Sequence, residues 1–300
     1  MPARRTAAMA VASQVRPYVG AVIFLVRRIA AVCVACAVFA ACGAPNAPRG
    51  PEQRSARSSA SASGEAALTP GSGGLMPVFK SARTQKKTIA LTFDADMTAD
   101  EGPRAADGER FDNPELIDAL RELKVPATVF MTGRWADQYP EEARGIGQDP
   151  LFEVANHSYS HYSFTDGCYG LPVLPESRMR SDVERGFTAI RNAGVAHPMP
   201  YFRFPGGCYD NRALRALGPL GVTVVQWDVV SGDAFATDPD AVARQVLRGV
   251  RPGSVVVMHC TRSAAPVTEP AVRALVPELR RQGYRLVKVS ELMGASGGGG

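Results

Sequence analysis

Short apolar runs alternate with amphipathic segments from about residue 78 to residue 293. Continuous apolar runs predict buried strands, which we place at residues 88–94, 127–133, 152–158, 201–207, 223–229 and 254–260. Apolar residues spaced by three and four predict helices, which we place at residues 113–124, 177–194, 240–250 and 270–283. Residues 285–292 form the last segment of this alternation of strands and helices. Strand–helix alternation of this kind predicts an α/β fold with a parallel sheet or barrel.

Polar side chains collect where these predicted strands end. They are Asp94 and Asp96, His157, Arg203, Asp228 and Asp233, and His259. In parallel α/β folds the chemistry sits at the carboxyl ends of the strands. The sequence therefore predicts that these side chains share one rim of the fold.

His157 and His161 are candidate metal ligands. They lie four residues apart in the run NHSYSH, and on a helical turn this spacing puts both imidazoles on one face. The pattern alone is weak, because short motifs of this kind occur by chance. Two histidines and one aspartate would leave an open coordination position, which is the arrangement of a catalytic zinc site.

The first 77 residues differ in composition from the rest of the chain. Arginines precede an apolar run at residues 29–43, and this order predicts a secretory signal peptide over residues 1–42. Residues 39–42 (FAAC) resemble a bacterial lipobox with Cys42 as the lipidated residue, although a plain signal peptide or an uncleaved anchor stays open. Residues 43–77 are rich in Pro, Ser, Gly and Ala and predict a disordered linker, as residues 294–300 predict a disordered tail.

The distribution of charge along the chain bears on the class of partner. The net charge is +5, but residues 1–60 hold eight arginines and one glutamate, so the remaining residues sum to −2. This distribution removes the support for a nucleic-acid partner.

Beyond the signal peptide, three cysteines remain, namely Cys168, Cys208 and Cys260. Because this number is odd, at most one disulfide can form among them. An oxidising compartment permits a Cys168–Cys208 disulfide, which is our prediction.

Five short motifs occur in order between residues 88 and 293. They are TFDAD at 92–96, HSYSH at 157–161, RFPGG at 203–207, Asp233 with Ala234, and VMH at 257–259. Together they resemble the motifs of the polysaccharide deacetylases, also called the NodB-homology or family 4 carbohydrate esterases. The resemblance implies one domain over residues 78–293 with a distorted (β/α) barrel fold of the NodB-homology type.

The resemblance also implies a divalent metal ion, which we expect to be Zn²⁺. Asp96, His157 and His161 would hold it, and Asp94 would be the general base. In the family the metal carboxylate follows the base directly, whereas here Ala95 intervenes. Either Asp96 reaches the metal from a bulged turn, or the site has only the two histidines and water.

Further roles carry over in the same way. His259 would protonate the leaving amine, and Arg203 would keep Asp94 ionised and oriented. Asp233 would orient Arg203 or tune His259. A backbone N–H near Gly206 would assist the metal in stabilising the oxyanion.

The RFPGG motif and one tryptophan supply the predicted substrate-binding residues. These are Pro205, Gly206, Gly207 and Trp227. The family places a Trp after the fourth-motif aspartate, and Ala234 stands there in this chain. Trp227 could replace that wall of the acetyl pocket, or it could be a core residue.

The implied function is metal-dependent removal of N-acetyl groups from a cell-envelope or extracellular polysaccharide, either peptidoglycan or a chitin-like glycan. O-acetyl xylan esterase activity and a non-catalytic glycan-binding role stay open. We expect an acetylated glycan as the partner, an extracytoplasmic monomer, and membrane attachment only through the signal or a lipid anchor.

Overall fold

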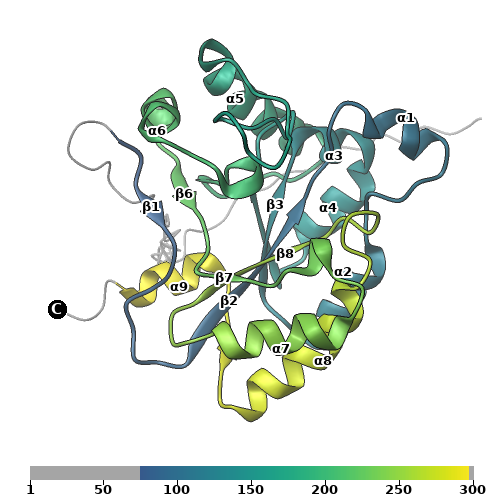
Figure 1. Cartoon of the computed structure of the whole chain (residues 1–300), viewed down its shortest axis with the longest axis vertical. Helices are drawn as coiled ribbons and strands as arrows, with labels where there is room; N and C mark the ends of the chain where they lie inside the picture. The colour runs from purple at the N-terminus through teal and green to yellow at the C-terminus, as the bar shows by residue number, and fades with distance from the viewer. Residues whose placement is uncertain (1–74, 297–300) are drawn as a thin grey trace, which may run out of the picture. The chain divides into compact units, whose positions relative to one another are not determined.

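The computed structural model describes residues 75–296, and these residues form one parallel sheet covered by helices (Figure 1). The strand order is β1-β6-β5-β4-β3-β2-β8-β7, and β9 pairs with β2. The strands are β1 (Val78–Phe79), β2 (Thr88–Ala95), β3 (Ala127–Met131), β4 (Phe152–Asn156), β5 (Tyr201–Phe202), β6 (Thr223–Val225), β7 (Val229–Val230), β8 (Val255–His259) and β9 (Arg285–Leu286). The predicted α/β class with a parallel sheet is therefore confirmed.

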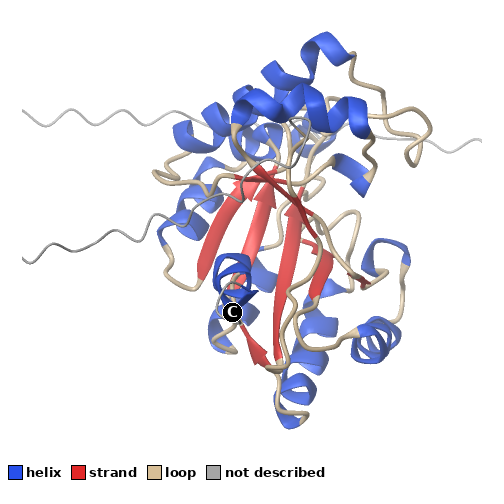
Figure 2. Ribbon diagram, turned by 90° about the vertical axis from the view of Figure 1, so that its left-hand side faces the viewer, coloured by secondary structure: helices blue, strands red, loops and turns tan. Residues whose placement is uncertain are grey.

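Helices cover the sheet, and Figure 2 shows them around the strands. The α-helices are α1 (Glu101–Ala106), α2 (Pro114–Glu122), α3 (Gly133–Gln138), α4 (Pro140–Gln148), α5 (Glu176–Asn192), α6 (Asn211–Leu217), α7 (Pro239–Gly249), α8 (Thr268–Arg281) and α9 (Val289–Ser296). Short 3-10 helices are η1 (Pro205–Gly207), η2 (Gly218–Leu220) and η3 (Asp233–Phe235). The four helices that the sequence pattern predicts correspond to α2, α5, α7 and α8.

The predicted strand at 223–229 is in fact two strands that belong to different parts of the sheet. Residues 223–225 form β6, which pairs with β1 and β5, whereas residues 229–230 form β7, which pairs with β8. β7 is the last strand of the order and β6 the second, so the short connection at 226–228 passes from one end of the sheet to the other. Four residue steps span at most about 14 Å. The sheet must therefore curl into a partial barrel whose two ends lie close together.

The predicted strand at 201–207 is also shorter than expected. β5 ends at Phe202, and residues 205–207 form a 3-10 turn in which Gly206 and Gly207 have φ angles of 64° and 73°. Proline cannot donate to a strand ladder, and positive φ does not fit an extended chain. The motif RFPGG is therefore a turn that follows the strand.

A few residues of the expected linker and of the expected tail take part in the described structure. Met76, from the expected linker, is buried in an apolar cluster, and α9 takes in residues 294–296 of the expected disordered tail. The N–H groups of Val289 and Ser290 donate to the side chains of Thr128 and Glu153, which stabilises the start of α9. The expected signal peptide, Cys42 and the linker up to residue 74 lie outside the described residues. Within residues 75–296 no helix is both long enough and apolar enough to span a bilayer.

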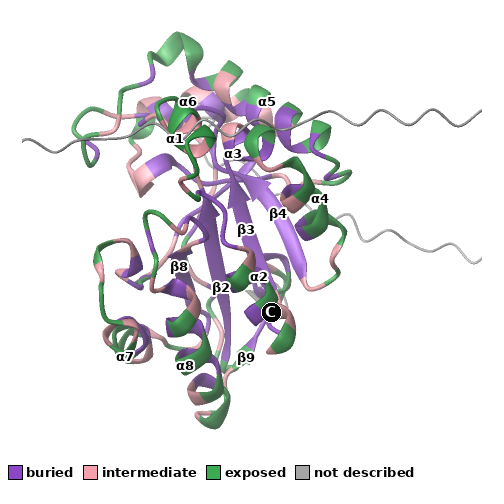
Figure 3. Ribbon diagram, turned by 90° about the vertical axis from the view of Figure 1, so that its right-hand side faces the viewer, coloured by how far each residue is buried: buried purple, intermediate pink, exposed green. Residues whose placement is uncertain are grey.

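The two faces of the sheet bury different sets of side chains. β2 is buried along its whole length (Figure 3), as expected for a parallel strand covered on both faces. Leu91, Phe93 and Ala95 lie in the larger cluster beneath the helices, whereas Ala90 belongs to the inner cluster with residues of α9. Side chains alternate along a strand, so Thr92 and Asp94 share the inner face with Ala90. The inner face becomes polar towards the carboxyl end of β2.

Candidate active site

The two aspartates of TFDAD lie on the same side of the chain. Asp94 is in β2, Ala95 is its last residue and is buried in the outer cluster, and Asp96 follows directly. Positions i and i+2 of an extended chain point the same way. The intervening Ala95 thus allows both carboxylates to face the interior of the curled sheet without the bulged turn that we considered.

His157 and His161 lie on an irregular loop after β4, so the predicted helical turn is wrong. Ser158 and His161 have φ angles of 72° and 58°, which no right-handed helix contains. Side chains hold this shape, because Asn156 Oδ1 accepts from the Ser158 N–H and Ser158 Oγ accepts from the His161 N–H. The two imidazole rings still approach each other, with their centroids 5.1 Å apart.

Asp96, His157 and His161 form a candidate metal centre. One ligand atom from each residue lies within 4.8 Å of the others, and His161 Nε2 is 3.3 Å from Asp96 Oδ2. His157 Nδ1–H donates to the carbonyl oxygen of Arg203 at 2.9 Å, which leaves the Nε2 lone pair available to a metal. The donor set of one carboxylate and two imidazoles fits a divalent ion such as zinc.

The protonation states suit metal binding. Burial lowers the pKa of His157 to about 4, so its imidazole is neutral at pH 7. Burial alone would raise the pKa of Asp96, but the imidazoles of His161 and His259 and a hydrogen bond from Thr261 Oγ outweigh it and hold that pKa below its usual value. A neutral imidazole and an ionised carboxylate are the forms that coordinate a metal.

Arg203 is wholly buried and holds Asp94. Its Nη1 donates to Asp94 Oδ1 at 2.6 Å and its Nη2 donates to Thr92 Oγ at 2.8 Å. The remaining Nε donates to the carbonyl of Val225 at 3.2 Å, and the guanidinium lies 3.9 Å from the ring centroid of Phe130. Each of the three guanidinium nitrogens thus donates a hydrogen bond, and these contacts fix the orientation of the Asp94 carboxylate.

Asp233 was expected to bind either Arg203 or His259. The structure contains the contact with His259. Asp233 Oδ1 accepts from His259 Nδ1 at 2.9 Å and Asp233 Oδ2 accepts from the His259 N–H at 2.7 Å. Ser231, Thr268 and the Ala234 N–H also donate to this carboxylate. Burial alone would lower the pKa of His259, but the hydrogen bond and charge of Asp233 prevail and raise it to about 9.

A pocket of about 270 Å³ joins these groups. Seven of the predicted residues line it, namely Asp94, Asp96, His157, His161, Gly206, Trp227 and His259. Arg203 and Asp233 lie behind the residues they bind, and Pro205 and Gly207 do not line the pocket. A Cβ on Gly207 would come within 2.4 Å of the Trp227 ring, so the glycine is needed for close packing of that wall. The Gly207 N–H donates to Phe204 O.

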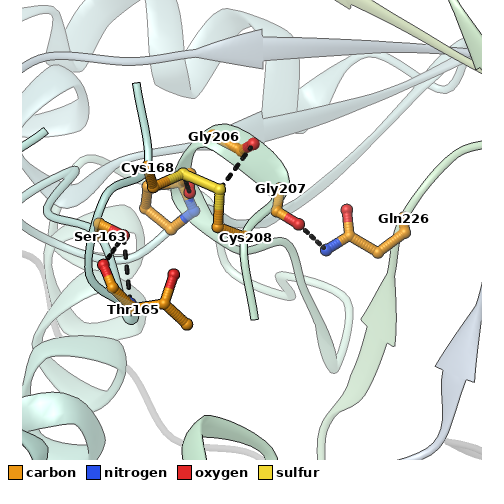
Figure 4. The surroundings of a disulfide bond; sticks show 8 residues. Ser163, Thr165, Cys168, Gly206, Gly207, Cys208 and Gln226 are labelled. Atoms are coloured by element: carbon orange, nitrogen blue, oxygen red, sulfur yellow. Dashed lines mark hydrogen bonds between the residues drawn. A yellow bond between two sulfur atoms is a disulfide. The ribbon is translucent and has the colours of Figure 1, made fainter. Parts of the chain in front are cut away.

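Six further residues line the pocket, and two of them, Ala234 and Val257, belong to the fourth and fifth motifs. The six are Tyr169, Leu171, Val230, Ala234, Phe235 and Val257. Tyr169 and Leu171 come from the loop that carries Cys168. The predicted Cys168–Cys208 disulfide is confirmed and joins this loop to the glycine turn (Figure 4).

No role was assigned from the sequence to three threonines that hydrogen-bond to the predicted site residues. Thr92 accepts from Arg203, Thr261 donates to Asp96, and Thr268 donates to Asp233. Thr92 lies two residues before Asp94 and Thr261 two residues after His259, so strand alternation could have indicated both. Thr268 starts α8, far along the chain, and no local pattern points to it.

The structure thus defines an α/β domain with a carboxylate–histidine cluster at the carboxyl rim of a curled parallel sheet, and comparison with known proteins gives the family. The family model described as polysaccharide deacetylase matches residues 81–225. A chitooligosaccharide deacetylase of Rhizobium leguminosarum bv. phaseoli is 33% identical, with 59% of this chain and 69% of the relative covered. The chain belongs to the polysaccharide deacetylase family.

A second relative and a solved structure extend the comparison. A peptidoglycan-N-acetylglucosamine deacetylase of Bacillus cereus is 26% identical over 69% of this chain and 89% of the relative. A solved CE4 family pseudoenzyme from Bacillus anthracis shares the fold, with a TM-score of 0.60 and 23% identity over 75% of this chain and 69% of that one. The predicted NodB-type fold is confirmed.

Proposed function

We propose that this domain is a metal-dependent hydrolase that removes N-acetyl groups from an extracytoplasmic polysaccharide, either peptidoglycan or a chitin-like glycan. One observation carries the proposal: a base, an acid and a three-residue metal-ligand set face one pocket of about 270 Å³. The names of the relatives support an N-acetylated glycan as the substrate class.

Asp94 is the general base of the proposed reaction. Its Oδ1 is engaged by Arg203, and its Oδ2 lies 3.6 Å from His157 Nε2, at the edge of the candidate metal centre. A carboxylate held in this way can take a proton from a water molecule that attacks the acetyl carbonyl. Arg203 holds the carboxylate in this orientation and prevents it from turning away.

The metal ligands are Asp96, His157 and His161, and we propose Zn²⁺ as the ion. When bound, a divalent ion of this type lowers the pKa of a coordinated water molecule and polarises a carbonyl group. The chain contributes the second half of the reaction through His259. Its Nδ1–H is taken by Asp233, so its Nε2–H is the proton available to the departing amine.

An extracytoplasmic location fits this substrate and the disulfide between Cys168 and Cys208. We therefore retain the proposal of an exported enzyme with a signal peptide over residues 1–42, either secreted or lipid-anchored. Of the substrate-binding residues proposed from the family, Gly206 and Trp227 line the pocket, whereas Pro205 and Gly207 would act by shaping the turn.

Acetate release from a glycan panel tests the proposal. The panel holds N-acetylglucosamine oligomers, soluble peptidoglycan fragments and O-acetylated xylan. We expect the zinc-loaded wild type to act on an N-acetylated member, and Asp94→Asn and His157→Ala to lose at least about a hundredfold in rate. Glu153→Gln, at a buried carboxyl group outside the pocket, is the matched control and should retain activity.

The other outcomes each have a definite meaning. Release from acetylated xylan alone would make the protein an esterase. Glycan binding without release, together with no zinc in metal-supplemented protein, would make it a non-catalytic relative. Equal release by the wild type and both site variants would refute the assigned base and metal ligands.

A further inference from the structure

The pocket gathers exposed apolar side chains to an unusual degree. In the part of the chain that the structure describes, four large hydrophobic residues are exposed: Tyr169 (78%), Val173 (43%), Val230 (52%) and Phe235 (86%). Three of the four, all except Val173, line the same pocket as the catalytic groups. Exposed apolar surface concentrated in this way indicates a binding site, because scattered exposed residues would be distributed over the whole surface.

Tyr169 and Phe235 come from two different elements of this pocket. Phe235 ends η3, two residues after Asp233, and Tyr169 belongs to the loop at residues 163–174. Aromatic faces supply a large rigid apolar area at little conformational cost, and they suit the apolar C–H faces of sugar rings. Neither side chain is packed in a core cluster, so burial of the fold does not explain them.

The loop at residues 163–174 is closed at its base by hydrogen bonds. The Ser163 N–H donates to the carbonyl of Pro172 at 2.9 Å, and the Leu174 N–H donates to the carbonyl of Ser163 at 2.8 Å. Near its tip the chain turns sharply, with positive φ at Gly167, Tyr169 and Gly170. An exposed tyrosine at a φ of 50° needs something outside the local backbone to hold it.

The disulfide supplies that restraint. Cys168 precedes Tyr169, and its partner Cys208 directly follows the turn at Gly206 and Gly207, as Figure 4 shows. The loop and the turn are in tight contact: a Cβ on Gly206 would lie 2.6 Å from Cys168 Sγ and 3.3 Å from the Tyr169 ring. The bridge therefore fixes the aromatic residue against a glycine that itself lines the pocket.

We infer that Tyr169 and Phe235 are specificity-determining residues that bind sugar rings next to the one being deacetylated, and that the Cys168–Cys208 bridge positions Tyr169 for this contact. The inference rests on the proposed function for the class of substrate. It makes the substrate an oligosaccharide of several rings, since a single acetylated sugar in the pocket would leave these outer faces unused.

Binding and turnover of an N-acetylglucosamine tetramer and of a soluble peptidoglycan fragment test the inference. For the better ligand we expect Tyr169→Ala and Phe235→Ala each to raise Kd and KM by about tenfold, with kcat within about twofold of wild type. Tyr169→Phe should retain the wild-type values, because it keeps the ring. Val173→Ala is the matched control, since Val173 is exposed on the same loop but does not line the pocket.

Hydrolysis of a small acetyl ester without a sugar separates this role from a structural one. The two alanine variants should hydrolyse the ester at the wild-type rate, because the base, the acid and the metal ligands are untouched. Mild reduction of the wild type should reproduce the rise in Kd for the oligosaccharide and spare the ester. A Cys168→Ser/Cys208→Ser variant should behave in the same way. If that variant fails to fold, the reduced wild type takes its place in the comparison.

The outcomes distinguish this inference from the proposed function. A tetramer that binds with the expected dependence on Tyr169 but releases no acetate would refute the hydrolase and leave the inference standing. Turnover with the same Kd in wild type, Tyr169→Ala and Phe235→Ala would overturn the inference alone. Failure of the wild type to bind either glycan would overturn both.

Discussion

Replacement of Asp233 by asparagine removes a buried negative charge and keeps the size of the side chain. Asp233 is 1% exposed, and its two oxygens bind the Nδ1–H and the backbone N–H of His259. Without the carboxylate, the burial of His259 is no longer opposed by its main anionic partner. We expect the pKa of His259 to fall from about 9 to 6.5 or below.

The size of the effect on the rate follows from the protonated fraction of His259. At pH 8 a histidine with a pKa of about 9 is about 90% protonated, whereas one with a pKa of 6.5 is about 3% protonated. Since the proposed acid must carry its proton, kcat/KM at pH 8 should fall by about thirtyfold or more. The deficit should grow with pH between 6.5 and 9, and the alkaline limb of the pH profile should move to lower pH.

The same shift has a consequence for stability. The folded-state pKa of His259 lies above its unfolded value, so the interaction contributes below pH 6.5 and is lost as the pH rises through about 9. A shift of this size corresponds to about 3 kcal/mol. Asp233→Asn should therefore remove most of this pH dependence from the free energy of unfolding.

Two measurements check the reasoning. The pH dependence of kcat/KM for acetate release gives the alkaline limb, and an NMR titration of the metal-free protein gives the pKa of His259 directly. Glu153→Gln again serves as the control, because Glu153 is a buried carboxyl group bound to Thr128 and Ser290 outside the pocket. An alkaline limb and a His259 titration that stay at the wild-type pH in Asp233→Asn would refute the role of Asp233.

Arg203→Met leaves the Asp94 carboxylate buried without its cation and should lower the free energy of unfolding, measured by urea denaturation, by about 3–5 kcal/mol. The double variant Arg203→Met/Asp94→Leu should recover much of this loss. A single variant as stable as the wild type would contradict the buried ion pair. Gly207→Ala places a Cβ 2.4 Å from the Trp227 ring at a φ of 73°, so we expect a loss of about 1–3 kcal/mol, whereas Gly145→Ala, on α4 with open space around it, should cost nothing measurable in the same assay.

The fold could be predicted from the sequence to the extent that burial alone determines it. β2, β3, β4 and β8 are covered on both faces, so continuous apolar runs mark them, and their bounds agree with the prediction to within about two residues. The prediction failed at residues 201–207 and 223–229, where the chain leaves the sheet to form the pocket. An apolar run does not show that Val225 and Val229 lie in strands from different parts of the sheet.

The site could be predicted in its membership but only partly in its geometry. The order of the motifs brought out Asp94, Asp96, His157, Arg203 and His259 as one group, and the structure places them together. The spacing of the two histidines suggested a helix, because residue types do not reveal positive φ at Ser158 and His161. The choice between two partners for Asp233 depended on a contact across the fold, which no local pattern contains.

The relation between the proposed base and the proposed acid follows from the register of two neighbouring strands. Asp94 of β2 is paired directly with His259 of β8. Paired positions on adjacent strands project to the same face, about 5 Å apart along the hydrogen-bonding direction. A slip of one residue in this register would turn His259 towards the helices and bring Cys260, now buried in the outer cluster, into the pocket. The strand register, together with the alternation of side chains along each strand, therefore also fixes which side chains can exchange protons with a substrate.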